Sequence, residues 1–329
     1  MVLTYLTSEN PAYSNPGLVV PTFTAWHRRE MSAGVLTAIK PSYTDPHILD
    51  KSRHGVNKGF GAHVVGLPKV SNGRTWVHFT GTGGRAYLER PHRFLNANWD
   101  NELMTQGYTV LDMAYDNEVS VTQSCSTPYC RNLDNCAGDI REEVLNAGGT
   151  SPLRAVTPFD SVRYRVLALV NYLYDNGFPI PPGLLPWDWN NVWVSGHSQG
   201  GCFAYYIAKL YGVKFCACFG SPYDVADVIP VPPSPSDPTT NIADWYQLPI
   251  QMTPTPSNIG GLVTVGEDAY DAFTGCYAII LHMTKGVHWF ECNDPPYHDE
   301  NGKVIDEHAA SIQDPKNAPL RAAAAFRLG

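Results

Sequence analysis

The chain has 329 residues, a formal net charge of −8 at pH 7 and only 16% charged residues, against roughly 25% in an average soluble domain. It has no basic run of the kind that nucleic-acid binding requires, and no apolar run reaches the roughly 18 residues of a membrane span. The opening stretch MVLTYLTSEN lacks the basic and apolar regions of a signal peptide. The composition therefore argues against a nucleic-acid-binding or membrane-spanning protein, and it leaves the oligomeric state open.

In chain order, the pattern predicts one domain over residues 1–329. Residues 1–70 are expected to form an irregular extension, with an edge strand at 59–68. Further strands are expected at 75–80, 108–115, 191–196, 213–222 and 259–266, and helices at 86–106, 138–149, 158–177 (capped by Asp160) and 201–212. Residues 276–283 fit a helix or a strand. This alternation predicts an α/β protein with a mostly parallel sheet and helices on both faces.

Residues 225–258 interrupt this alternation, because they contain eight prolines. Backbone that lacks N–H donors cannot join a central strand. We therefore expect a lid-like insertion that passes over the carboxyl edge of the sheet. Trp245 and Tyr246, near its end, are candidates for the wall of a substrate pocket, with plain core packing as the alternative.

The eight cysteines favour an oxidising, extracellular compartment. Cys125, Cys130 and Cys136 lie in one short loop, and such spacings are typical of disulfides. A zinc site is less well supported, because no second Cys or His pair with ligand spacing lies near. Cys216 and Cys218 fit a buried strand, whereas Cys276 and Cys292 are candidates for a second bridge across a hairpin.

The stretch VWVSGHSQGG (192–201) contains the pattern G-x-S-x-G between a predicted strand and a predicted helix. In that position Ser198 would lie on a tight, strained turn, and Gly196 and Gly200 would relieve clashes with the neighbouring backbone. The hydroxyl would stand at the N-terminus of the next helix, where the helix dipole and the amide of Gln199 stabilise negative charge. Ser198 is therefore predicted to be a nucleophile.

A second amide donor is expected in HFTGTGG (78–84), whose glycines let the backbone approach a substrate closely. By position, the donor is the amide of Thr82. A phosphate-binding loop is the weaker interpretation, because neither a Lys-Ser/Thr pair nor a ribose-binding acid follows.

The base is expected late in the chain. His308, in a predicted loop before the last helix, is preferred over His298 and His288. His78 and His282 lie in apolar segments, and His197 should point away from the hydroxyl of Ser198.

The acid that orients the base should follow a strand between the serine and the histidine. Asp268 and Glu267 both follow the strand at 259–266, and Asp224 follows the preceding one. Asp268 is preferred, since aspartate is the commoner choice, and the two alternatives stay open.

Together, HFTGTGG, CSTPYCRNLDNC, VSGHSQGG, FGSPYD and DEHAASIQD resemble the α/β-hydrolase superfamily, especially its secreted lipase- and esterase-like members, over roughly residues 70–329. The resemblance implies a serine nucleophile at Ser198, an acid at Asp268, a base at His308 and an oxyanion hole made by the amides of Thr82 and Gln199. It also implies a disulfide between Cys125 and Cys136.

The expected activity is hydrolysis of a small or polymeric carboxylic ester, without a metal or organic cofactor. The sequence departs from many esterases in having Thr80-Gly81-Thr82 in place of His-Gly-Gly, closer to lipase and cutinase loops. A serine peptidase, an acyltransferase or a catalytically silent binding protein on the same fold are the alternatives.

Overall fold

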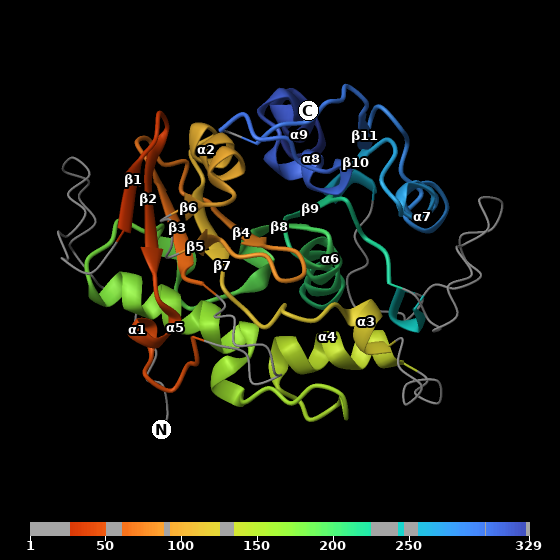
Figure 1. Cartoon of the computed structure of the whole chain (residues 1–329). Coiled ribbons are helices and arrows are strands. Elements are labelled where there is room, and N and C mark those ends of the chain that lie inside the picture. Colours follow the sequence, from red (N-terminus) through yellow and green to blue (C-terminus); the bar gives the residue numbers. More distant parts are fainter. Residues whose placement is uncertain are drawn as a thin grey trace.

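The computed structural model describes residues 27–50, 61–88, 93–125, 135–224, 243–246, 256–299 and 301–326. Its centre is a twisted nine-stranded sheet with the strand order β1-β2-β3-β7-β4-β8-β9-β10-β11 (Figure 1). The strands are β1 (His27–Glu30), β2 (Gly34–Ile39), β3 (His63–Pro68), β4 (Thr75–Phe79), β7 (Thr109–Met113), β8 (Trp193–His197), β9 (Phe215–Phe219), β10 (Ile259–Thr264) and β11 (Trp289–Cys292). A separate two-stranded ribbon pairs β5 (Tyr87–Leu88) with β6 (Arg93–Phe94).

The six strands from β7 to β11 in this order run parallel, whereas β1, β2 and β3 pair antiparallel with their neighbours. Parallel neighbours are joined by helical crossovers, which cover both faces of the sheet. The predicted fold class, a mostly parallel sheet with helices on both faces, is therefore confirmed.

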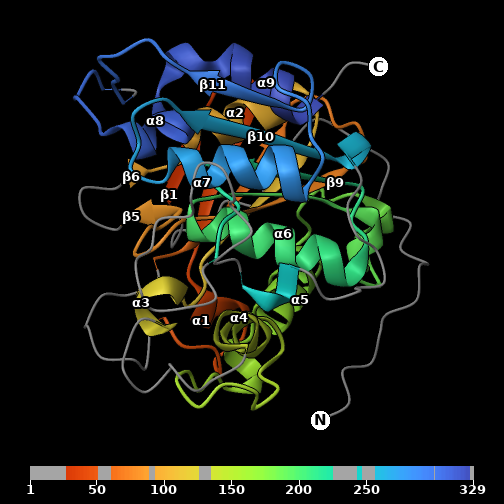
Figure 2. The ribbon, with the colours of Figure 1, turned by 90° about the vertical axis from the view of Figure 1, so that its right-hand side faces the viewer.

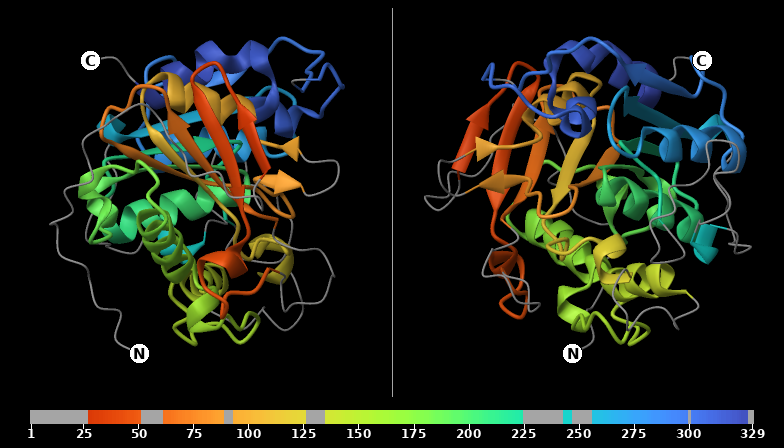
Figure 3. Two further views of the ribbon diagram at one scale, coloured as in Figure 1. Left: turned by 90° about the vertical axis from the view of Figure 1, so that its left-hand side faces the viewer. Right: turned by 45° about the vertical axis from the view of Figure 1, so that its right-hand side comes forward.

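Two helical layers enclose the sheet (Figures 2 and 3). The helices are α1 (Pro41–Thr44), α2 (Ala97–Thr105), α3 (Val121–Cys125), α4 (Cys136–Asn146), α5 (Val162–Asp175), α6 (Gln199–Tyr211), α7 (Tyr270–Gly275), α8 (Glu307–Gln313) and α9 (Ala318–Phe326). One apolar core lies between the sheet and α4, α5 and α6, and a second lies between the sheet and α2, α8 and α9. Short 3-10 turns occur at Pro158–Asp160, Pro182–Leu184, Trp189–Asn191, Asp244–Tyr246, Pro256–Asn258 and Pro315–Asn317, and a π-helical turn at Cys276–Ile280.

The prediction of an irregular N-terminal extension is wrong for residues 27–50 and 61–68. Three strands of the main sheet come from this region, and β3 lies between β2 and β7 rather than at an edge. All residues of β2 and of β3 are buried, in keeping with their mostly apolar sequences GVLTAI and HVVGLP. Residues 1–26 lie outside the described residues.

Two helix predictions also need correction. The predicted helix at 86–106 begins only at Ala97, since Pro91 cannot donate a helical hydrogen bond inside such a helix. The cap of α5 is Ser161, whose hydroxyl accepts the N–H of Tyr164. Asp160 instead accepts the N–H of Leu49 and pairs with a buried arginine.

Most of the proline-rich segment 225–258, and so its lid-like role, lies outside the described residues. Within the described part of the chain, no helix is long and apolar enough to cross a membrane.

Candidate active site

Ser198 lies on a sharp turn between β8 and α6. Its backbone has φ 56° and ψ −126°, a combination that non-glycine residues rarely adopt and that costs on the order of 1–3 kcal/mol. The turn places the half-buried serine at the N-terminus of the 13-residue helix α6. A strained serine directly after a buried strand is the geometry that lifts a hydroxyl above the edge of a sheet.

The two glycines of the G-x-S-x-G pattern have the steric role that the sequence predicts. A Cβ on Gly196 would lie 2.1 Å from the carbonyl oxygen of Gly200, and a Cβ on Gly200 would lie 2.1 Å from that of Phe79. Any side chain at either position would therefore clash with the backbone. The elbow is therefore packed backbone to backbone against the end of β4.

The loop after β4 lies directly over the elbow. A Cβ on Gly81 would be 3.0 Å from the Cβ of Ser198, and the hydroxyl of Thr82 donates a 2.8 Å hydrogen bond to Oε1 of Gln199. The N–H of Thr82 has no acceptor among the described residues, and Gln199 is the first residue of α6, so its N–H has no acceptor within the helix. The structure thus brings both predicted amide donors to the serine.

His308 is paired with a carboxylate, but the carboxylate is Glu267. Nδ1 of His308 lies 2.7 Å from Oε2 of Glu267, whose side chain is 1% exposed, against 41% for that of the histidine. The other carboxylate oxygen accepts the N–H of Thr264 at 2.7 Å. Both oxygens of Glu267 are therefore held, and the carboxylate fixes the imidazole from the Nδ1 side.

Three contacts place this imidazole beside the elbow. The N–H of Ser198 donates to the carbonyl of Phe219 at 2.8 Å, and a Cβ on the next residue, Gly220, would lie 3.1 Å from Cε1 of His308. Nε2 of His197 donates to the carbonyl of His308 at 2.7 Å. His308 is the second residue of helix α8, not part of a loop as the sequence suggests.

His197, inside the elbow, remains neutral. Loss of hydration, together with the adjacent imidazole of His308, lowers its pKa to about 3. A neutral ring that donates from Nε2 carries no proton on Nδ1. The side chain thus ties the elbow to the backbone of α8 and, as predicted, is engaged away from the serine hydroxyl.

The preferred acid, Asp268, does not reach the histidine. Its side chain is exposed, whereas its neighbour Glu267 turns inward. The physical reason is the turn after β10, in which Gly266 has φ 93° and reverses the chain so that Glu267 folds back on the strand. Asp224 is also excluded from contact with His308, because both of its oxygens bind the buried guanidinium of Arg141 at 2.5 and 2.6 Å.

The alternative histidines lie elsewhere. Nδ1 of His288 accepts the N–H of Thr284, and the backbone of His298 forms a bridge with Val304.

A serine–histidine contact lies inside the sheet. Nδ1 of His78 is 2.8 Å from Oγ of Ser195, which also accepts the indole N–H groups of Trp76 and Trp99. All four side chains are fully buried. Burial lowers the pKa of His78 to about 3. This contact therefore satisfies polar groups in the core and is closed to any substrate.

A buried carboxyl pair lies on the same face. Asp112 is next to His78 in the β4–β7 register, and one of its oxygens accepts the side-chain N–H of Asn96 at 2.7 Å. Burial raises the pKa of Asp112 to about 8, and burial with the charge of Asp112 raises the pKa of Asp100 well above its ordinary value. These groups are thus held protonated near neutral pH.

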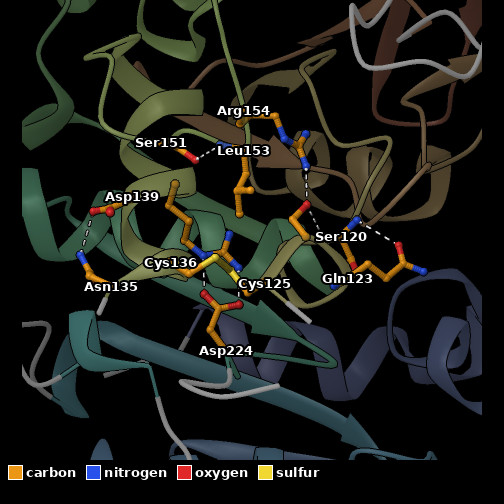
Figure 4. Close-up of a disulfide and its surroundings, with 12 residues drawn as sticks. Ser120, Gln123, Cys125, Asn135, Cys136, Asp139, Ser151, Leu153, Arg154 and Asp224 are labelled. Atoms are coloured by element: carbon orange, nitrogen blue, oxygen red, sulfur yellow. Dashed lines mark hydrogen bonds and ion pairs between the residues drawn. A yellow bond between two sulfur atoms is a disulfide. The ribbon is translucent and has the colours of Figure 1, made fainter. Parts of the chain in front are cut away.

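One disulfide joins Cys125 at the end of α3 to Cys136 at the start of α4, which confirms the pair that the resemblance implies (Figure 4). Cys276 and Cys292 are separate buried thiols, so the predicted second bridge is wrong. Cys216 and Cys218 lie in β9, as predicted. The described residues contain no group of three or more side chains that could hold a metal ion.

Trp245 and Tyr246 are packed in the interior rather than against an open pocket. Trp245 is fully buried and donates its indole N–H to Asp224 at 2.9 Å, and Tyr246 is 5% exposed. Their rings pack on Tyr205 of α6. Core packing accounts for both aromatics, and we do not assign them to the substrate.

A strained serine after β8, an amide loop after β4 and a carboxylate after β10 now stand at one edge of a mostly parallel sheet. The chain has the α/β-hydrolase fold. No protein-family model and no curated protein matches the sequence.

Solved structures with a similar arrangement include EstE1, a thermostable carboxylesterase from a metagenomic library. It has a TM-score of 0.41 and 12% identity, over 96% of this chain and 90% of that one. XC6422 from Xanthomonas campestris, described as a serine hydrolase without a lid, has a TM-score of 0.38 and 12% identity over 95% and 97% of the two chains. Esterase B from Lactobacillus rhamnosis has a TM-score of 0.36 and 13% identity over 74% and 73%.

Proposed function

We propose that the protein is a serine carboxylic-ester hydrolase in which Ser198, His308 and Glu267 form the catalytic triad. The observation that carries this proposal is the 2.7 Å contact between His308 and a buried carboxylate, beside a serine held in a strained turn. A carboxylate on Nδ1 favours the tautomer in which Nε2 is free to accept a proton. That is the state that a general base requires.

In this mechanism Oγ of Ser198 attacks the ester carbonyl carbon while Nε2 of His308 takes its proton. The amides of Thr82 and Gln199 stabilise the oxyanion. When the tetrahedral intermediate collapses, the C–O bond to the alcohol breaks and His308 returns the proton to the leaving oxygen. Water then attacks the acyl-enzyme with His308 as base, and releases the acid and free serine.

The same residues serve a serine peptidase or an acyltransferase, since the triad does not determine the leaving group or the acceptor. A binding protein without activity is disfavoured by the strain at Ser198, which has no structural benefit of its own. Esterase activity is favoured over these alternatives by the resemblance of the loop Thr80-Gly81-Thr82 to lipase and cutinase loops.

The test compares wild type with Ser198→Ala on p-nitrophenyl esters and on matched anilides. We expect ester hydrolysis and covalent labelling by a fluorophosphonate in wild type, and a loss of turnover on the order of 10⁴-fold or more in the variant. Near-native turnover in Ser198→Ala would refute the mechanism. Faster cleavage of anilides than of esters would favour the peptidase.

We also propose that the protein functions outside the reducing cytosol. The disulfide Cys125–Cys136 supports this, because such bonds persist mainly in oxidising compartments. Non-reducing peptide mapping of protein isolated from its source tests it, since Cys125 alkylated as a free thiol would contradict it.

A further inference from the structure

A single buried asparagine, Asn117, is bound to most of the loop that carries Thr82. Its side-chain N–H groups contact Oγ1 of Thr80 at 2.9 Å, the carbonyl of Gly81 at 2.6 Å and the carbonyl of Gly84 at 2.9 Å. The backbone carbonyl of Asn117 accepts the N–H of Gly83 at 2.8 Å. Asn117 is 2% exposed, so water does not compete for these bonds.

The carbonyl of Gly81, which accepts both from Asn117 and from the N–H of Gly84 at 2.9 Å, determines where the N–H of Thr82 points. The carbonyl of Gly81 and the N–H of Thr82 belong to one planar trans peptide, in which they point in opposite directions. Because Asn117 holds the carbonyl in the interior, the N–H is directed away from Asn117. Gly81 lies beside Ser198, since a Cβ atom on Gly81 would be only 3.0 Å from the Cβ of Ser198.

The other contacts keep this peptide from rotating. The bonds to Gly83 and Gly84 fix the loop beyond Thr82, and the hydroxyl of Tyr115 donates to the carbonyl of Thr80 at 2.7 Å before it. Because the backbone is held on both sides of Thr82, its N–H does not have to reorient as negative charge develops on the oxyanion.

We propose that Asn117 is the positioning residue of the oxyanion hole: its amide holds the carbonyl of Gly81 inward so that the N–H of Thr82 faces the oxyanion at Ser198. This inference rests on the proposed function, because it assigns a partner to the oxyanion donor of that reaction. Asn117 does not touch the substrate. It acts through the peptide between Gly81 and Thr82.

The experiment compares Asn117→Asp and Asn117→Ala with Tyr115→Phe. The aspartate has the shape of asparagine but no N–H groups, and it places oxygen against the carbonyl of Gly81. We expect kcat on a p-nitrophenyl ester to fall about 10- to 100-fold with KM changed less than threefold, because the contact acts on the transition state. Tyr115→Phe removes the bond to the carbonyl of Thr80 but leaves the carbonyl of Gly81 bound to Asn117, so kcat should fall less than in either Asn117 variant.

Fluorophosphonate labelling separates folding from positioning. The end point of labelling counts folded sites, and the labelling rate per site reports stabilisation of the oxyanion. We expect a full end point and a 10- to 100-fold slower rate in whichever Asn117 variant folds. A wild-type rate per labelled site in that variant would overturn the role of Asn117, whereas no labelling of the wild type would instead refute the proposed function.

Discussion

Replacing Glu267 with glutamine should trap His308, the proposed general base, in the wrong tautomer. Glutamine has one oxygen and one NH2 group where glutamate has two oxygens. Oε1 of Glu267 accepts the N–H of Thr264, and Oε2 faces Nδ1 of His308, both at 2.7 Å. If the glutamine oxygen faces Thr264, its NH2 group donates to Nδ1 of His308. The proton of the imidazole then sits on Nε2, which can no longer accept the proton of Ser198.

The opposite orientation of the glutamine leaves the buried N–H of Thr264 facing another donor. An unsatisfied buried donor costs about 1–3 kcal/mol, so the unproductive orientation is preferred by that amount. Loss of the carboxylate also removes a charge-assisted hydrogen bond to the imidazolium, worth about 1.5–3 kcal/mol. Each 1.36 kcal/mol of activation free energy changes the rate tenfold, so these two costs together predict a fall in kcat of about 10²- to 10⁴-fold.

The assay is steady-state hydrolysis of a p-nitrophenyl ester, with folding checked by circular dichroism and thermal unfolding. Asp268→Asn is the matched control, because it makes the same chemical change at the adjacent, exposed position. It should change kcat less than threefold. A large loss in Asp268→Asn beside near-native turnover in Glu267→Gln would refute the assignment of the acid.

Three further predictions concern stability. Cys125→Ser should lower the free energy of unfolding by about 2–3 kcal/mol in urea titrations, as estimated for an 11-residue separation, while reduction of wild type gives the same loss. Asp224→Asn leaves Arg141 buried without its counter-ion and should cost about 3–5 kcal/mol in urea titrations, with kcat per folded site falling far less than in Glu267→Gln. Because the pKa of Asp112 is raised to about 8 in the folded protein, its contribution to stability is complete below about pH 4. The free energy of unfolding then falls by up to about 1.4 kcal/mol per pH unit as the pH rises toward 8. Asp112→Asn should reduce this dependence of stability on pH. An unchanged slope in the variant would show that another group titrates.

The sequence predicts those parts of the site that depend on local sterics. The elbow follows from G-x-S-x-G, since only glycine fits where Gly196 and Gly200 meet backbone at 2.1 Å. Asn117 has no such signal. It lies 36 residues from Gly81 in the chain, and only the pairing of β4 with β7 brings the two together. The strand at 34–39 did carry a signal, a mostly apolar run that the surrounding Pro and Gly residues obscured, whereas the strand at 63–68 was expected, but at an edge of the sheet.

The register of the parallel strands explains why a residue that directly follows a strand is a good candidate for the site. It does not explain which of two adjacent residues in such a loop faces the site. Phe79 pairs with Gly196, His197 with Phe219, and Phe219 with Leu262, so parallel strands end at nearly the same level. Loops that follow them must meet, as ligand-binding loops do at the carboxyl edge of open α/β sheets. Within each loop, however, the direction of a side chain depends on the φ and ψ of the turn. The positive φ of Gly266 reverses the chain and turns Glu267 inward, so the alternation expected of an extended strand does not apply to the acidic pair. The backbone of that turn, rather than the reach or frequency of aspartate, therefore selects which carboxylate meets the histidine.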